Sequence, residues 1–134
     1  MKYYAVFDTN VLVSAMITHN SGSATVRVIE QVVKGLLIPL FNNEILLEYQ
    51  DVLSRSKFNL REEDVLSMLD LFVDNGCWAG REAADIPFPD SDDIVFYEVA
   101  MSKDDAFLIT GNIRHFPKTS KVVTPAEMLE ILGV

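Results

Sequence analysis

The chain has 134 residues, of which 49% are hydrophobic and 23% charged, so it can close one core and is expected to form a single domain over residues 1–134. Its formal net charge of −9, from 20 acidic and 11 basic residues, disfavours simple electrostatic binding of a nucleic acid. The sequence shows neither a membrane span nor a signal peptide, which predicts a soluble, cytoplasmic protein with no membrane partner.

Apolar runs of strand length alternate with segments of helical periodicity in the first half of the chain. Residues Tyr3 to Phe7 form the first apolar run, and Asp8-Thr9-Asn10 interrupts it before the apolar segment 11–17. Asp, Thr and Asn commonly cap helices, so this pattern predicts a strand, a polar cap and a helix. The elements expected next are a helix at Ala24–Lys34, a strand at 36–40, a helix at 44–55 capped by Asn42 or Asn43, and a helix at Leu60–Val73.

The second half begins with a segment whose structure is harder to predict. The single cysteine, Cys77, cannot form an internal disulfide and is expected to be a buried small hydrophobe. Residues 80–89 contain two prolines and read as an extended connection, with a short strand at Arg81–Ala83 as an alternative. The remaining elements expected are a helix at 94–103, a strand at 106–110, a short strand at 121–123, and a helix at 124–132 opened by Thr124, Pro125 and Glu127.

The alternation of strands and helices defines the expected fold. Strands separated by helical segments of this length pair in parallel through right-handed crossovers. The sequence therefore predicts an α/β fold, a three-layer α/β/α sandwich around a central, mainly parallel sheet.

Acidic and amide side chains gather at one edge of the predicted sheet. Asp8 follows the first strand, Asn112 follows the strand at 106–110, and Asp90, Asp92 and Asp93 stand at the start of a helix. In open α/β sheets ligands bind beyond the carboxyl ends of the strands, where such residues lie. Oxygen ligands without accompanying His or Cys suit hard cations, so Mg²⁺ or Mn²⁺ is the expected ion.

Each of these acids also has an ordinary structural explanation. An Asp at a helix start is usually a cap, and a helical Glu such as Glu48 is usually solvated or paired with a base. Glu48 reaches the sheet edge only if its helix packs beside the first strand. The cluster favours a site because Asp8 ends a very apolar strand, where an unpaired carboxylate is costly, and because other acids are expected beside it.

Five segments of the chain match a known family in order and spacing: DTNVLVSAM, EILLEYQDVL, PDSDDIVFYEVA, LITGNIRHFP and VVTPAEMLEIL. Together they resemble the PIN-domain family over Tyr4 to Leu132, and more narrowly the toxins of toxin–antitoxin systems related to the VapC-type toxins. The resemblance implies a metal-dependent endoribonuclease, the toxin of a type II system, that hydrolyses RNA phosphodiesters with metal-activated water. It also implies a protein antitoxin as partner and a homodimeric state.

The resemblance assigns the catalytic acids. The three family acids that bind Mg²⁺ or Mn²⁺ correspond to Asp8, Glu48 and Asp93, and Asp93 is preferred to its neighbours because it stands seven residues before Ala100. Asp90 and Asp92 are expected to be auxiliary ligands or caps.

One position departs from the family pattern. A fourth acid often follows the late strand, and this chain has Asn112 there. An Asn can offer a carbonyl oxygen to a metal ion, but the loss of one negative charge should weaken a second metal site.

Small polar and basic residues surround these acids in the sequence. Three of them are expected either to orient ligands and water or simply to cap and pack: Asn10, Ser14 and Thr110. Three basic residues are expected either to bind RNA phosphates or to form an ordinary solvated loop: Arg114, Lys118 and Lys121. His115 is interpreted as structural rather than as a general base.

Two other functions remain open on the sequence. A catalytically weak PIN-fold binding module, using its acidic face for a protein partner, is favoured by Asn112 and by the charge of −9. A PIN nuclease that processes nucleic acids outside a toxin–antitoxin system would use the same site. A phosphoryl-receiver domain is disfavoured, because no central Asp is matched by a Lys after a late strand.

Overall fold

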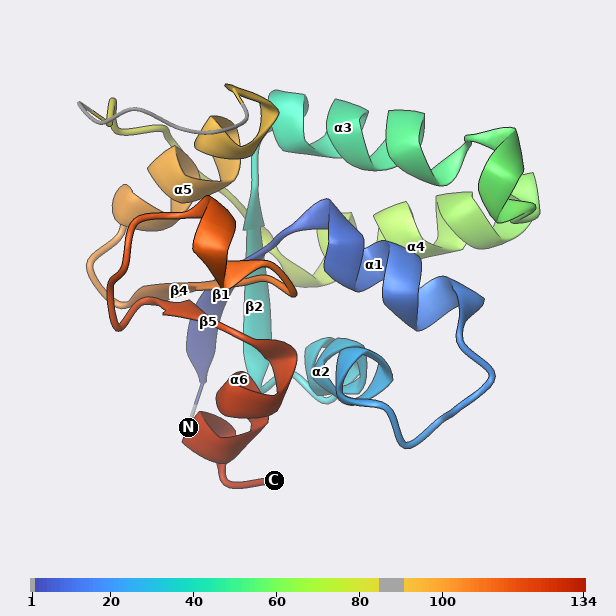
Figure 1. Cartoon of the computed structure of the whole chain (residues 1–134), viewed down its shortest axis with the longest axis horizontal. Helices are drawn as coiled ribbons and strands as arrows, with labels where there is room; N and C mark the ends of the chain where they lie inside the picture. Colours follow the sequence, from blue (N-terminus) through green and yellow to red (C-terminus); the bar gives the residue numbers. More distant parts are fainter. Residues whose placement is uncertain (1, 85–90) are drawn as a thin grey trace.

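A five-stranded parallel sheet forms the centre of the molecule in a computed structural model that describes residues 2–84 and 91–134 (Figure 1). The strands lie in the order β3-β2-β1-β4-β5, and each pairs in parallel with its neighbours. Their bounds are β1 Tyr3–Phe7, β2 Leu37–Phe41, β3 Cys77–Trp78, β4 Ala106–Ile109 and β5 Val122–Val123. The predicted α/β fold with a parallel sheet is therefore confirmed.

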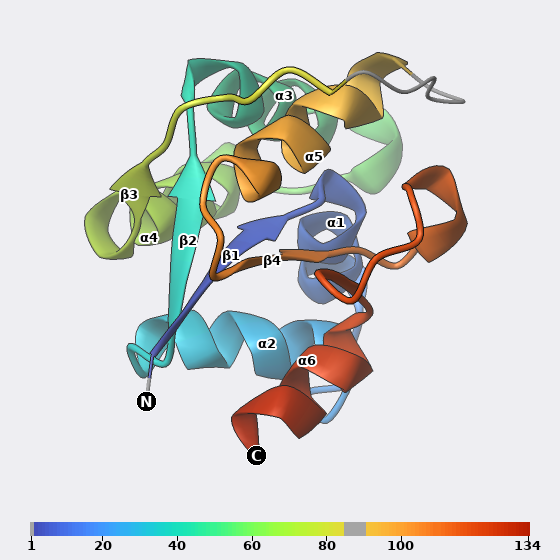
Figure 2. The ribbon, with the colours of Figure 1, turned by 90° about the vertical axis from the view of Figure 1, so that its left-hand side faces the viewer.

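Helices cover the sheet from both sides. Their bounds are α1 Thr9–Ile17, α2 Ala24–Val33, α3 Asn43–Leu53, α4 Glu62–Asn75, α5 Ile94–Met101 and α6 Pro125–Leu132, with short 3₁₀ helices η1 Ser56–Phe58, η2 Ser91–Asp93 and η3 Ile113–His115. In both views α3 and α5 lie on one side of the central strands, whereas α2 and α6 lie together on the other (Figures 1 and 2). Within residues 2–84 and 91–134, no helix has the length and apolar character needed to cross a membrane.

The strand residues make the core, and polar side chains fix the helix starts. Ala5, Val6 and Phe7 of β1 are fully buried, as expected for the central strand of a parallel sheet covered on both faces. The Asn42 side chain accepts a hydrogen bond from the Ile45 N–H, so Asn42 rather than Asn43 caps α3. Thr124 and Glu127 form the expected capping box at α6, where each side chain binds the other's backbone N–H.

The segment after α4 differs from its prediction. The edge strand β3 occupies Cys77–Trp78 and pairs with Leu40 and Phe41, whereas no strand forms at Arg81–Ala83. The prediction that Cys77 is buried is wrong: Cys77 is exposed, and Trp78 is 60% exposed with its ring edge-on to that of Phe41. Two residues at a sheet edge are too few to show a periodic pattern, so this strand could not be predicted from periodicity.

Gly76 allows this turn from helix to strand. A Cβ atom at this position would lie 2.3 Å from the Pro39 carbonyl oxygen, so no other residue fits without a backbone shift. Gly76 thus follows the last residue of α4 and also permits the close approach of β3 to β2.

Candidate functional site

Asp8 lies at the carboxyl end of the central strand, immediately before α1. Its carboxyl group is 5% exposed and makes no capping hydrogen bond to the helix that it precedes. Instead, Oδ2 accepts hydrogen bonds from Thr110 Oγ1 at 2.7 Å and from Asn10 Nδ2 at 3.2 Å. The Asp8 side chain thus joins the end of β1 to Thr110 at the end of β4.

The end of β4 supplies the other half of this arrangement. Thr110 is fully buried, and its Oγ1 also accepts a hydrogen bond from the Asn112 N–H at 2.9 Å. The Gly111 N–H donates to Asn10 Oδ1 at 3.1 Å. Hydrogen bonds of Asp8, Asn10 and Thr110 thus connect the carboxyl ends of β1 and β4.

The electrostatic environment of Asp8 disfavours a negative charge on the free protein. Burial raises the pKa of Asp8 to about 6; the Thr110 hydrogen bond opposes this rise, and the negative charge of Asp93 adds to it. Asp93 ends η2, its side chain is 16% exposed, and its Oδ2 lies 3.3 Å from His115 Nδ1. Two carboxylates that repel one another at a buried strand end are an arrangement that a cation would stabilise.

Helix α3 packs against the same end of β1. The Tyr49 hydroxyl donates a 2.5 Å hydrogen bond to the Phe7 carbonyl, and the Tyr49 side chain is fully buried. Burial raises the pKa of Tyr49, and the negative charge of Asp8 adds to this effect. The condition set by the sequence for Glu48, that its helix packs beside the first strand, is therefore met, and Glu48 itself is half-buried.

The acids do not converge completely. Among the described residues, no group of three or more Asp, Glu, His or Cys side chains is close enough to form a ready-made metal cluster. Asp92 is exposed, and Asp90 lies outside the described residues. The structure thus brings Asp8 close enough to Asp93 for their charges to interact, and Glu48 lies on the neighbouring helix α3.

The smaller polar residues divide into two groups. Asn10 and Thr110 contact the Asp8 carboxylate, as a residue that orients a ligand must. Ser14 faces α2, where its Oγ lies 3.3 Å from Thr25 Oγ1. Asn112 is exposed beside the site and contacts Thr110 through its backbone.

The basic residues after β4 also lie in different places. Lys121 donates from Nζ to the carbonyls of Ala100 at 3.2 Å and Lys103 at 2.9 Å, so its ammonium group is engaged at the C-terminal end of α5. Arg114, in η3, and Lys118 are exposed. These two remain the basic side chains of this loop that are open to a ligand.

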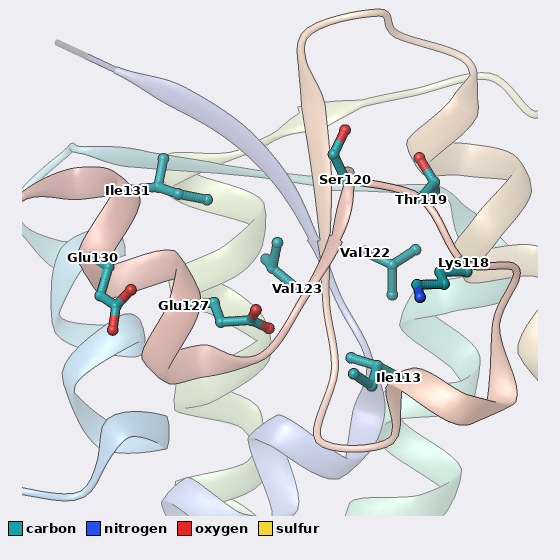
Figure 3. Close-up of a pocket in the computed structure, with 9 residues that line it drawn as sticks. All are labelled: Ile113, Lys118, Thr119, Ser120, Val122, Val123, Glu127, Glu130 and Ile131. Atoms are coloured by element: carbon teal, nitrogen blue, oxygen red, sulfur yellow. The ribbon is translucent and has the colours of Figure 1, made fainter.

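Lys118 borders a groove of about 910 Å³ between η3, β5 and α6 (Figure 3). Ile113, Val122, Val123 and Ile131 give it an apolar lining, and Glu127 and Glu130 lie on its α6 side. The carboxylates of Glu127 and Glu130 would repel a phosphate backbone. A phosphate bound by Lys118 is therefore expected near η3 and away from α6.

Sequence reasoning missed two contacts that build the site. Tyr49 is not among the site residues that the sequence indicates, although a buried Tyr usually has a hydrogen-bond partner for its hydroxyl. The contact of His115 with Asp93 was not predicted either. No local pattern could have shown it, because it joins the loop after β4 to the start of α5.

The pair Asp8 and Asp93 fits a hard divalent ion. Mg²⁺ is usually bound by one or two carboxylates, with water and substrate phosphates completing its octahedral shell. The buried Asp8 carboxylate, held by two hydrogen bonds and beside a second acid, provides this kind of donor set.

Comparisons with known proteins bear on the same residues. A search of curated proteins finds no match. A family model described as the PIN domain matches residues 4–114, a range that includes Asp8, Glu48, Asp93 and Asn112. The match covers most of the chain and agrees with the parallel sheet and the acids at its carboxyl edge, so the protein belongs to the PIN-domain family, whose members are generally nucleases that use divalent metal ions.

Proposed function

We propose that the protein is a Mg²⁺- or Mn²⁺-dependent endoribonuclease whose catalytic acids are Asp8, Glu48 and Asp93. The observation that carries the proposal is the Asp8 carboxylate, buried at the end of β1, held by Thr110 and Asn10, and close enough to Asp93 for their charges to interact. A buried acid with a raised pKa beside a second acid is costly for stability unless it serves a site.

The chain's own residues have separable roles in this proposal. Asp8 and Asp93 hold the ion, and Thr110 and Asn10 fix the orientation of the Asp8 carboxylate. Tyr49 fixes α3 against β1, which keeps Glu48 on the side of the site. When bound, the ion supplies an activated water and neutralises charge on the scissile phosphate.

The residues at the rim would act on the substrate. Arg114 and Lys118 are proposed to bind RNA phosphates, because both are exposed on the loop that leads from Thr110 past Asp93. Asn112 and Asp92 are proposed as auxiliary oxygen donors. Lys121 and Ser14 have no part in the proposal, since their polar groups are engaged elsewhere.

The test is cleavage of a mixed RNA pool in Mn²⁺, Mg²⁺ or EDTA by the wild type and by Asp8→Asn and Asp93→Asn. We expect metal-dependent cleavage that falls by about a hundredfold or more in both variants, because each removes charge needed to hold the ion. The matched control is Asp70→Asn, which removes one acid from the exposed face of α4 and should leave cleavage unchanged. Equal cleavage by Asp8→Asn and the wild type would refute the assignment.

The narrower proposal is that the protein is the toxin of a type II toxin–antitoxin system, with a protein antitoxin and a homodimeric state. The match of five segments to the VapC-related branch supports it. Expression of the wild type in a bacterial host should arrest growth with loss of intact RNA, whereas Asp8→Asn should not. Cleavage in vitro without growth arrest would favour a nuclease of nucleic-acid processing instead. Light scattering tests the homodimer.

A second candidate is a catalytically weak binding module with the PIN fold. It is favoured by Asn112, in place of an acid, and by the incomplete convergence of the described acids. A folded wild type that neither cleaves RNA nor binds Mn²⁺ by calorimetry would establish this candidate over the nuclease.

A further inference from the structure

Residues 81–84, which follow β3, are bound to two helices of the candidate site (Figure 2). Arg81 donates from Nη1 to both carboxylate oxygens of Glu44, at 2.7 and 2.6 Å, and from Nε to Glu98 Oε1 at 2.5 Å. Glu44 lies in the first turn of α3, whereas Glu98 lies in the middle of α5. One guanidinium group therefore connects α3 to α5.

The α5 side of this connection is held by further bonds. Glu98 Oε2 accepts a hydrogen bond from the Ala84 N–H at 2.5 Å, and the Glu98 carbonyl accepts one from the Glu82 N–H at 3.1 Å. The Glu98 side chain is 7% exposed, whereas that of Glu44 is 59% exposed. The guanidinium group is therefore anchored on α5, and its contact with Glu44 extends the connection to α3.

Each of the two glutamates lies near a proposed catalytic acid of its own helix. Glu44 precedes Glu48 by four residues, which places the two on one side of α3 and about 6 Å apart along its axis. Glu98 follows Asp93 by five residues, in the helix that begins directly after Asp93. Because a helix moves as a rigid element, a shift of α3 relative to α5 would change the separation of Glu48 and Asp93.

The two helices are thus connected at two separate points. Their apolar sides meet at Tyr49 and Phe96, whose ring centroids are 6.2 Å apart. Arg81 adds a connection between polar side chains, and its planar guanidinium group presents different nitrogen atoms to Glu44 and to Glu98. Two separate connections restrict rotation of one helix against the other, which a single ring contact would allow.

We propose that Arg81 is a positioning residue that fixes α3 relative to α5 and thereby sets the separation of Glu48 and Asp93 for metal binding. This inference rests on the proposed function, because it assumes that both acids take part in holding the ion. A purely structural Arg81 would contribute to the stability of the fold without affecting the metal affinity of the folded protein.

The test measures the Mn²⁺ affinity of the substrate-free protein by calorimetry in Glu44→Ala and Arg81→Lys, at a temperature where thermal scans show each variant to be folded. Glu44→Ala removes the contact with α3 and keeps the pair of Arg81 with the buried Glu98. Arg81→Lys keeps the positive charge, but a single ammonium group cannot reproduce contacts made by two different nitrogen atoms. We expect the Kd for Mn²⁺ to rise by about 3- to 30-fold in both variants, the usual size of effects transmitted through packed rigid elements.

The matched control for Glu44→Ala is Asp51→Ala. Asp51 is an exposed acid of the same helix that pairs with the nearby Arg55 at 3.1 Å, so its loss removes one negative charge from α3 and leaves the connection to α5 intact. A rise of less than about threefold in Glu44→Ala, or an equal rise in Asp51→Ala, would overturn the inference. If Asp8→Asn still abolishes Mn²⁺ binding in that case, the nuclease proposal stands. Absence of Mn²⁺ binding by the wild type would overturn both proposals.

Discussion

Asp8 shows how a single buried carboxyl group links the stability of this protein to its site. Burial holds its pKa at about 6, above the ordinary value of 3.8, so the native state binds a proton between these pH values more tightly than the unfolded chain does. The free energy of unfolding of the metal-free protein therefore contains a contribution that is complete below pH 4 and is lost as pH rises through 6. Above that pH, Asp8 destabilises the fold.

Asp8→Asn should accordingly stabilise the metal-free protein near neutral pH. The expected gain in unfolding free energy is on the order of 2 to 3 kcal/mol at pH 7.5, and it should shrink toward zero at pH 4, where Asp8 is protonated in both states. Urea denaturation in EDTA across this pH range measures the difference. A variant less stable than the wild type at pH 7.5 would contradict the prediction and show that Asp8 does not carry an unfavourable charge.

At the residue scale, the sequence predicted the place of Asp8 in the fold better than the contacts of its side chain. The place of Asp8 after an apolar strand is visible in the local sequence, whereas the preference for Asp93 over Asp90 and Asp92 comes from the family resemblance. The hydrogen bond from Thr110 to Asp8 joins residues 102 positions apart, and the contact of His115 with Asp93 depends on side-chain direction. Such contacts follow from the packing of the sheet, which no local pattern specifies.

At the element scale, the segment after β3 is attached to two helices by one arginine. Arg81 donates to Glu44 at the start of α3 and to Glu98 on α5, whose side chain is 7% exposed. Glu98 also accepts the Ala84 N–H; this bond, and then Arg81, lower its pKa against the opposing effect of burial. Figure 2 shows this segment crossing over α3 and α5. Helix α3 contains Glu48, and α5 begins directly after Asp93.

Replacing Arg81 should loosen this junction. Arg81→Met is expected to lower the unfolding free energy by about 1 to 3 kcal/mol at pH 7, because the buried Glu98 carboxylate loses a charged partner. Since the pKa of Glu98 is lowered in the folded state, its contribution is present above the unfolded-state pKa and is lost as pH falls through the folded pKa. The loss on substitution should therefore be smaller in acid.

The matched control for Arg81→Met is Arg61→Met. Arg61 pairs with Glu63 and Asp64 in exposed positions, where ion pairs contribute about 0 to 1 kcal/mol. Thermal unfolding of the two variants gives the comparison. Equal losses would show that the bonds of Arg81 to Glu98 and Glu44 count no more than an ordinary surface pair.

The helices and strands could be predicted from the sequence except near β3. Helices α2, α3 and α6 carry periodic apolar residues and capping side chains, so their starts were predicted to within a residue or two. Strand β3 has two residues and an exposed Trp78, and it exists because β2 offers it an edge. Its position depends on pairing with β2, and the sequence of residues 77–78 alone does not predict that pairing.

At the scale of the whole molecule, the net charge of −9 means that a bound cation should increase the free energy of unfolding. An ion that binds only the native state adds RT ln(1 + [L]/Kd), about 2.7 kcal/mol when the free ion is at 100 times its Kd. Mn²⁺ should therefore raise the Tm of the wild type and offset the loss of stability that the ionised Asp8 causes near neutral pH. The Tm of Asp8→Asn should rise much less. A thermal scan with Mn²⁺ or with EDTA makes the comparison. An equal gain in both proteins would point to non-specific binding to the acidic surface.

The parallel sheet also sets when during synthesis the site can exist. Strand β1 lies between β2 and β4, and β4 pairs with it only through residues about a hundred positions later in the chain. Thr110 and His115 follow β4, so a ribosome must translate most of the chain before Asp8 or Asp93 acquires these partners. A nascent chain that stops before β4 therefore contains both acids but lacks the contacts that surround Asp8.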